Sequence, residues 1–156
     1  MPILQKAVEL DLNGTLRLFD ETGKRTAGCF SRLINENAAV FEHYFGVKLF
    51  PGSLNIDVPY PSSLQRDLDA GRPSPCIVIP KRELINMPTH IGDGQVWPCD
   101  LNGSRFSIPI NCWIFRRKGS QVPAGVIEIL SREPLREPYE LKHGDPVTIE
   151  VFGSSK

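Results

Sequence analysis

Two polar residues are spaced in a way that could support metal-assisted chemistry. Ser53 and Asn55 stand two positions apart in "FPGSLNIDV", directly after the turn signal Pro51-Gly52. In an extended segment alternate side chains point to the same face, so these two would face one way while Leu54 faces the other. Two neutral oxygen groups at this spacing can finish a strand edge, or they can hold a hard cation such as Mg²⁺. The residues alone leave both interpretations open.

A third candidate is the carboxylate of Glu128, in the segment "GVIEIL". Its neighbours Ile127 and Ile129 are apolar and β-branched, a pattern that is typical of a strand. The carboxylate then points away from the apolar face, either into a cavity or to solvent. It is a candidate general base, and an ordinary outward strand glutamate is the alternative.

Composition limits the class of protein. The chain has 156 residues, 40% hydrophobic and 23% charged, which predicts one folded domain over residues 1–156. Its formal net charge of zero gives no general basic field, so nucleic acid is an unlikely partner. No long apolar stretch predicts a signal peptide or a membrane span, so we expect a cytoplasmic protein. The cysteines lack metal-site spacing and are expected to be buried, reduced thiols: Cys29, Cys76, Cys99 and Cys112.

The pattern of short apolar runs between glycines and prolines predicts a mainly β fold. We expect strands over 7–13, 15–20, 29–33, 53–58, 76–80, 95–101, 105–115, 125–131 and 146–152, with a hairpin turn at Asn102-Gly103. A sheet of six or more strands in a small chain avoids open edges best by closing on itself. The sequence therefore predicts a closed β-barrel.

One or two short helices interrupt the strands. Asn35 is expected to cap a helix over "ENAAVFEHYF", which places Phe41 and Phe45 on one buried face and ends at Gly46. A shorter helix is expected to begin at Ser62 and to turn Leu68 inward.

Four segments in fixed order resemble the archaeal CTP-dependent riboflavin kinase family. They are "FPGSLNIDV", "SQVPAGVIEIL", "EPLRE" and "LKHGDPVTIEV". The family carries P-G-T-L-N, a Thr eight residues before a Glu, K-L-R-E and L-K-D-G-D at the corresponding places. The resemblance covers roughly residues 8–152, although residues 59–95 match nothing specific. It implies a closed six-stranded cradle-loop β-barrel that transfers a phosphoryl group from CTP to riboflavin, giving FMN.

The resemblance also assigns roles to residues. Ser53 and Asn55 match the Mg²⁺ ligands, and Glu128 matches the catalytic glutamate that also contacts the flavin. Ser120 stands where the family has a flavin-contacting Thr. The implied contacts to the nucleotide come from three segments: Lys24, Arg25, Thr26, Ala27 and Gly28; Glu133, Pro134, Leu135 and Arg136; and Gly144 and Asp145.

One segment departs from the family pattern. The family has a G-x-G-x-G stretch where this chain has "GKRTAG" at 23–28, so Lys24 and Thr26 replace two glycines. Lys24 and Arg25 could bind phosphates as charges, in place of the backbone N–H groups of such a loop. The change favours an alternative function, a family member that has lost catalysis and binds a nucleotide or flavin as a sensor or partner protein.

Overall fold

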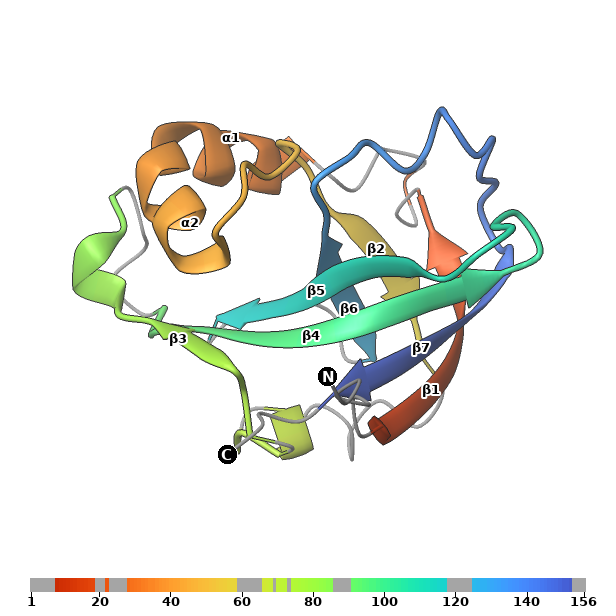
Figure 1. Ribbon diagram of the computed structural model, residues 1–156, viewed down its shortest axis with the longest axis horizontal. Coiled ribbons are helices and arrows are strands. Elements are labelled where there is room, and N and C mark those ends of the chain that lie inside the picture. The colour runs from red at the N-terminus through yellow and green to blue at the C-terminus, as the bar shows by residue number, and fades with distance from the viewer. Residues whose placement is uncertain are drawn as a thin grey trace, which may run out of the picture.

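The computed structural model describes residues 8–18, 22, 28–58, 66–68, 70–72, 74–85, 91–117 and 125–152. Within them the chain forms one antiparallel sheet and a few short helices (Figure 1). The strands are β1 (Val8–Arg17), β2 (Leu54–Asp57), β3 (Ile77–Ile79), β4 (Gly94–Gly103), β5 (Ile110–Arg117), β6 (Val126–Leu130) and β7 (Pro146–Phe152). The helices are α1 (Gly28–Glu36), α2 (Ala38–Phe45) and the short 3₁₀ helix η1 (Lys81–Glu83).

The sheet closes on itself. Its strand order is β3-β4-β5-β6-β2-β1-β7, and β7 pairs in turn with β4. Six strands thus form a closed ring, while β3 pairs with β4 only. Closure removes the open edges that six short strands would otherwise expose. The predicted mainly β fold with six strands in a closed sheet is confirmed.

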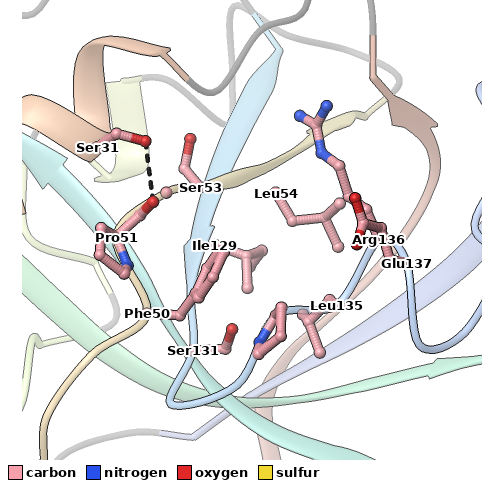
Figure 2. A pocket seen from close by; sticks show the side chains of 12 residues that line it. Ser31, Phe50, Pro51, Ser53, Leu54, Ile129, Ser131, Leu135, Arg136 and Glu137 are labelled. Atoms are coloured by element: carbon pink, nitrogen blue, oxygen red, sulfur yellow. Dashed lines mark hydrogen bonds between the residues drawn. The ribbon is translucent and has the colours of Figure 1, made fainter.

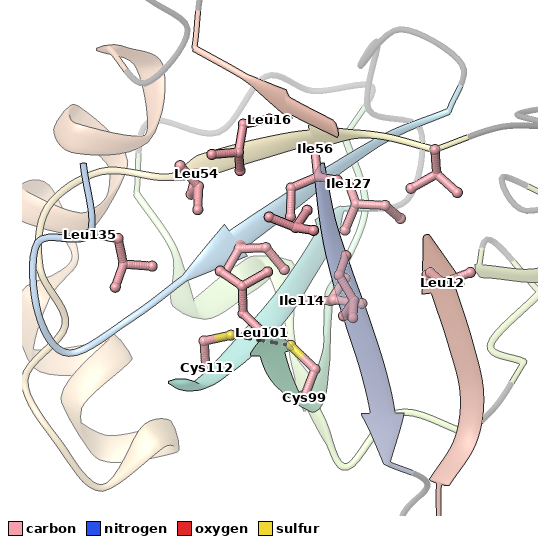
Figure 3. Close-up of a cluster of buried hydrophobic side chains, with 14 of the residues drawn as sticks. Leu12, Leu16, Leu54, Ile56, Cys99, Leu101, Cys112, Ile114, Ile127 and Leu135 are labelled. Carbon is pink, nitrogen blue, oxygen red and sulfur yellow. Dashed lines mark hydrogen bonds between the residues drawn. The ribbon is translucent and has the colours of Figure 1, made fainter. Parts of the chain in front are cut away.

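Alternate residues of the strands fill the ring. Ile56, Ile114 and Ile149 are at most 1% exposed, and they pack in one cluster with Leu12 and Leu101. Figure 3 shows Leu12, Ile56, Leu101 and Ile114 of this cluster gathered between the strands. Residues at the positions between them, such as Asn55 and Glu128, therefore point to the outer face.

Helices α1 and α2 cover a second, outer cluster against β4, β5 and β6. Phe41 of α2 lies 5.7 Å from Phe115 of β5, centroid to centroid, and Phe30 of α1 lies 5.6 Å from the same ring. Gly46 ends α2 with a φ of 74°, as the sequence predicts.

Residues 29–33, predicted to be a strand, are instead part of α1. The buried residues Phe30, Leu33 and Ile34 recur at the helical spacing, which a window of five residues could not distinguish from a strand. Asn37, and not Asn35, precedes α2. The buried Asn37 side chain bonds to three backbone groups, the Leu33 carbonyl at 3.0 Å, the Ile85 N–H at 2.8 Å and the Ile85 carbonyl at 3.3 Å.

Other predicted boundaries also change. Asn102 and Gly103 remain in β4, where they pair with Thr148 and Val147 of β7, and β5 begins only at Ile110. Residues Ser62–Gln65 of the predicted second helix lie outside the described residues, but Leu68 is buried as predicted. Cys99 and Cys112 are buried free thiols as predicted, whereas Cys76 is exposed because it precedes the peripheral strand β3.

The predicted strands 7–13 and 15–20 are one continuous strand, β1, which passes through Gly14. Up to Thr15 this strand pairs with β7, and from Thr15 it pairs with β2. A Cβ on Gly14 would lie 2.5 Å from the Asp57 carbonyl oxygen and 2.7 Å from Cγ2 of Ile56. The glycine therefore permits close approach of two strands and does not form a turn.

We expect Gly14→Ala to lower the free energy of unfolding by about 2 kcal/mol, because a methyl group there overpacks the contact with β2. Thr15→Ala, at the adjacent exposed position, should change it by less than about 0.5 kcal/mol. Urea denaturation of the two variants measures the difference. Equal stability of Gly14→Ala and the wild type would show that β1 and β2 lie further apart than described.

Carboxylates face one another on the outer face of β1, β7 and β4. Glu150 of β7 lies opposite Asp11 of β1 on one side and opposite Asp100 of β4 on the other. Like charges directly opposite one another destabilise a sheet. We therefore expect Glu150→Gln to raise the free energy of unfolding by about 0.5 kcal/mol at low ionic strength. The gain should shrink in 1 M salt, and a loss of stability at low salt would contradict the expected repulsion.

Candidate active site

The structure brings Ser53 and Asn55 together at the start of β2. Ser53 is 7% exposed and Asn55 is 8% exposed. The hydroxyl of Ser53 donates a hydrogen bond to Oδ1 of Asn55 at 3.1 Å. The preceding Pro51-Gly52 turn and the apolar anchor Leu54 fix both side chains on the same side of the strand.

These two oxygens fit a magnesium ion that also binds phosphates. Neighbouring ligands of octahedral Mg²⁺, with bonds of 2.0–2.1 Å, lie about 2.9 Å apart, close to the 3.1 Å found here. Among the described residues there is no group of three or more His, Cys, Asp or Glu side chains that could hold a metal. A magnesium ion at Ser53 and Asn55 would therefore complete its shell with water and substrate oxygens.

Glu128 lies next to this pair on the outer face. Asn55 is directly opposite Glu128 of β6 on one side and directly opposite Arg17 of β1 on the other. Arg17 also forms an ion pair with Asp57 at 3.4 Å. The three residues that the sequence singled out for chemistry thus form one polar group: Ser53 directly before β2, Asn55 on β2 and Glu128 on β6.

The sheet has a gap between β5 and β6 beside Glu128. Strand β6 pairs with β2 along four residues, but it pairs with β5 only through Ile129 and Leu130. Beyond these pairs a small hollow lies between the strands, and its lining includes Glu128, Arg116 and Arg117. The carboxylate of Glu128 therefore faces a gap in the sheet next to two arginines.

Burial raises the pKa of Glu128 from its ordinary value of 4.5 to about 7, and the charges of Arg117 and Arg116 oppose this rise only in part. Arg117 is held in place by Phe30 of α1, since its guanidinium carbon lies 5.2 Å from the centre of that ring. A carboxyl group with a pKa near 7 can accept a proton from a substrate hydroxyl at neutral pH.

A pocket of about 490 Å³ lies beside Ser53 (Figure 2). Its wall includes Ser53 and the loop after β6, of which Pro134, Leu135 and Arg136 were predicted to bind a nucleotide. Glu133 of that prediction is not part of the lining, but its carbonyl accepts a hydrogen bond from Ser131 at 2.6 Å. The volume lies within the range of small-molecule sites.

Gly144 and Asp145 form a turn that supports β1 and do not line this pocket. The Gly144 N–H donates to the Leu16 carbonyl at 2.8 Å, and Gly144 has a φ of 88°. The Asp145 carboxylate accepts the Lys142 N–H at 2.9 Å and pairs with Arg105 at 3.4 Å. The turn therefore fixes the end of β1, the same segment whose Leu18 carbonyl accepts a bond from Arg136 at 3.4 Å.

Five of the predicted site residues lie outside the described residues: Lys24, Arg25, Thr26, Ala27 and Ser120. Gly28, predicted as the last residue of the phosphate loop, is the first residue of α1. Helix α1 in turn contributes Ser31 to the pocket.

The lining also contains residues that the sequence did not single out as site residues, among them Ser31, Phe50, Ser131 and Glu137. Phe50 directly precedes the Pro51-Gly52 turn, and Ser131 directly follows β6, so both adjoin predicted site segments. Ser31 carried no signal, because its segment was interpreted as a strand.

Comparison with known proteins identifies the family of the chain. The chain matches, over residues 26–151, the model of the CTP-dependent riboflavin kinase family, which is described as a domain of unknown function, DUF120. The chain belongs to this family. The predicted resemblance is confirmed.

This member of the CTP-dependent riboflavin kinase family has curated relatives that are named riboflavin kinase. The protein of Methanospirillum hungatei is 31% identical over 142 residues, which are 91% of this chain and 58% of the relative. The protein of Saccharolobus solfataricus is 34% identical over 69% of this chain and 57% of the relative. The protein of Thermococcus kodakarensis is 28% identical over 76% of this chain and 51% of the relative. The chain thus spans somewhat more than half the length of these relatives.

We searched the helices of the described residues for one that could cross a membrane. None of these helices combines the length and the apolar character that a bilayer span requires.

Proposed function

We propose that the protein is a kinase that transfers a phosphoryl group from CTP to the ribityl 5′-hydroxyl of riboflavin, giving FMN and CDP with Mg²⁺ as cofactor. Family membership and the names of the curated relatives support this reaction. The alternative of a binding protein without catalysis has less support, because a binding protein has no need of both a metal pair and an adjacent carboxylate.

The observation that carries the proposal is the position of Ser53 and Asn55 between two features. On one side Ser53 lines the 490 Å³ pocket with Arg136. On the other side Asn55 adjoins Glu128 and the gap between β5 and β6. A donor in the pocket and an acceptor hydroxyl at Glu128 would therefore meet at the metal pair, as in-line transfer requires.

Each of these residues then has its own role in phosphoryl transfer. Arg136 supplies positive charge for the phosphates in the pocket. Ser53 and Asn55 would hold Mg²⁺, which neutralises charge on the phosphate oxygens when bound. Glu128 orients the riboflavin hydroxyl and accepts its proton.

The direct test is to incubate the purified protein with riboflavin, Mg²⁺ and each of the four common nucleoside triphosphates, and to measure FMN by chromatography. FMN formation with CTP supports the proposal. Binding of flavin or nucleotide without any FMN would replace the kinase with the sensor or partner function. A protein that shows no turnover and binds neither flavin nor nucleotide would refute both functions.

A further inference from the structure

A short path of hydrogen bonds joins the turn after Leu141 to the large pocket. The backbone N–H of Leu18, one residue after β1, donates to Nδ1 of His143 at 3.1 Å. The carbonyl of Leu18 accepts a bond from Nη1 of Arg136 at 3.4 Å. Arg136 lines the pocket, and its own carbonyl accepts the Leu141 N–H at 3.0 Å. The loop after β6, the end of β1 and the turn are therefore connected in one unit.

The imidazole of His143 takes the place of a backbone acceptor. Two residues earlier, Leu16 exchanges two backbone bonds with the turn. Its N–H donates to the Asp145 carbonyl at 2.9 Å, and its carbonyl accepts the Gly144 N–H at 2.8 Å. At Leu18 the acceptor is the imidazole instead. Leu18 is 5% exposed, so its N–H would be costly to leave without an acceptor.

This bond requires one particular form of the imidazole. A ring nitrogen accepts a hydrogen bond only when it carries no proton, so neutral His143 must hold its proton on Nε2. A protonated imidazole has an N–H on both nitrogens, and Nδ1 would then face the Leu18 N–H as a second donor. Imidazole is also the side chain that ordinarily changes its charge between pH 5 and 8. Acidification therefore removes the acceptor of the Leu18 N–H.

Three segments meet at His143, and each carries charged side chains. Their charged residues are Lys142 and Asp145 of the turn, Arg17 of β1, and Arg132, Glu133, Arg136, Glu137 and Glu140 of the segment after β6. The Asp145 carboxylate accepts the Lys142 N–H at 2.9 Å and pairs with Arg105 at 3.4 Å. The carboxylate nearest to His143 in the chain is thus already engaged, and protonation of the imidazole acts chiefly through the bond to Leu18.

We propose that His143 is a positioning residue for the phosphoryl donor: through the backbone of Leu18 it holds the guanidinium of Arg136 toward the donor phosphates. The inference rests on the proposed function, in that the large pocket holds the donor with its phosphates near Arg136. It adds a residue outside the pocket lining on which donor affinity depends, and it makes that affinity weaker in acid.

The affinity for CDP with Mg²⁺, measured by calorimetry at pH 8 and pH 5.5, tests this role without any contribution from catalysis. We expect His143→Ala to weaken binding about fivefold at pH 8, which is the usual effect of one hydrogen bond. His143→Asn carries an oxygen that can accept the Leu18 N–H and does not titrate, so it should bind within about twofold of the wild type. At pH 5.5 the wild type should fall to the affinity of His143→Ala, whereas His143→Asn should keep its advantage of about fivefold over His143→Ala.

Two controls separate positioning from general damage. His43→Asn makes the same exchange at an exposed position of α2 and should match the wild type at both pH values. In turnover at pH 8, His143→Ala should raise the KM for CTP about fivefold and leave the KM for riboflavin unchanged, which a generally loosened fold would not do. Comparison of variants at one pH also cancels the titration of the nucleotide phosphates.

A second measurement tests the hydrogen bond without any nucleotide. ¹⁵N NMR of the free protein at pH 8 should show that Nε2 of His143 carries the proton and that Nδ1 does not. A proton on Nδ1 would overturn the inference, because the imidazole could not then accept the Leu18 N–H.

The outcomes distinguish this inference from the kinase proposal. FMN formation together with wild-type CDP affinity in His143→Ala at pH 8, or with the same pH dependence in the wild type and His143→Asn, would overturn the role of His143 and leave the kinase intact. The expected pattern of CDP affinities without FMN formation would support His143 and refute the kinase. A wild type that neither binds CDP nor forms FMN would overturn both.

Discussion

Glu128→Gln is expected to lower kcat for FMN formation by about 10²-fold or more, which is the usual effect of losing a general base. Glutamine has nearly the same shape and keeps an oxygen that can hold the substrate hydroxyl, but it cannot accept the proton. The KM values for both substrates should change little, because the loss falls on the transition state. Steady-state kinetics with saturating Mg²⁺ measure the effect.

Glu150→Gln is the matched control, since it makes the same exchange on the outer face of β7, at a distance in the sheet from β2 and β6. Its kcat should equal that of the wild type. A Glu128→Gln variant with wild-type kcat would show that Glu128 is not the base, and the position of the riboflavin hydroxyl would then have to be sought elsewhere around the metal pair.

The same substitution should change how stability depends on pH. The pKa of Glu128 in the folded protein is about 7, above its ordinary value of 4.5. The folded state therefore holds this proton more tightly than the unfolded state, and the resulting stability is complete below about pH 4.5. It is lost as the pH rises to about 7, and the total loss is about 3 kcal/mol.

Glu128→Gln should remove this decline, so the variant should become more stable than the wild type above pH 7. The difference between the two urea denaturation midpoints, measured from pH 4.5 to pH 8, isolates Glu128 from the other acids. A difference that stays constant over this range would mean that Glu128 is not buried as a neutral acid.

The second large effect is expected for Asn55→Ala, which should lower kcat by about 10²-fold or more through loss of a metal ligand. The concentration of Mg²⁺ needed for half-maximal activity should rise at the same time, because only the Ser53 oxygen remains of the pair. Asn55→Asp, which keeps an oxygen in the same place, should restore the affinity for Mg²⁺.

Asn111→Ala serves as the control, because Asn111 is exposed on the outer face of β5. It should leave both kcat and the Mg²⁺ requirement unchanged. Normal Mg²⁺ dependence in Asn55→Ala would refute the metal site. A lower kcat with normal Mg²⁺ dependence would instead assign Asn55 to positioning Glu128, its neighbour across β2 and β6.

Much of the sheet could be predicted because strands alternate on a period of two. Residues 53–58, 125–131 and 146–152 contain β2, β6 and β7 respectively, and their alternate apolar residues fill the ring. The α1 segment could not be assigned, since five residues of mixed polarity fit a strand as well as a helix. Its identity depends on the surface formed by Phe115 and Leu130, against which Phe30 packs.

Gly14 is a second place where local sequence alone does not predict the structure. The sequence predicts a break between two strands at this glycine. The strand continues because β1 lies against β2 at that residue, and glycine leaves room for the Asp57 carbonyl. Pairing between distant strands in the closed sheet outweighs the local preference of a single glycine for a break in the strand.

The sequence by itself determined the groups that can do chemistry: a hydroxyl and an amide two positions apart, and a carboxylate between branched apolar neighbours. Strand alternation was enough to give each of them a face. Only the tertiary structure decided that β2 and β6 are neighbours in register, which places Asn55 opposite Glu128. Only the tertiary structure decided, too, that α1 and the loop after β6 bring Ser31 and Arg136 to one pocket beside Ser53. The physical reason is that pairing and packing between distant segments depend on the burial of the whole ring, which no local window contains.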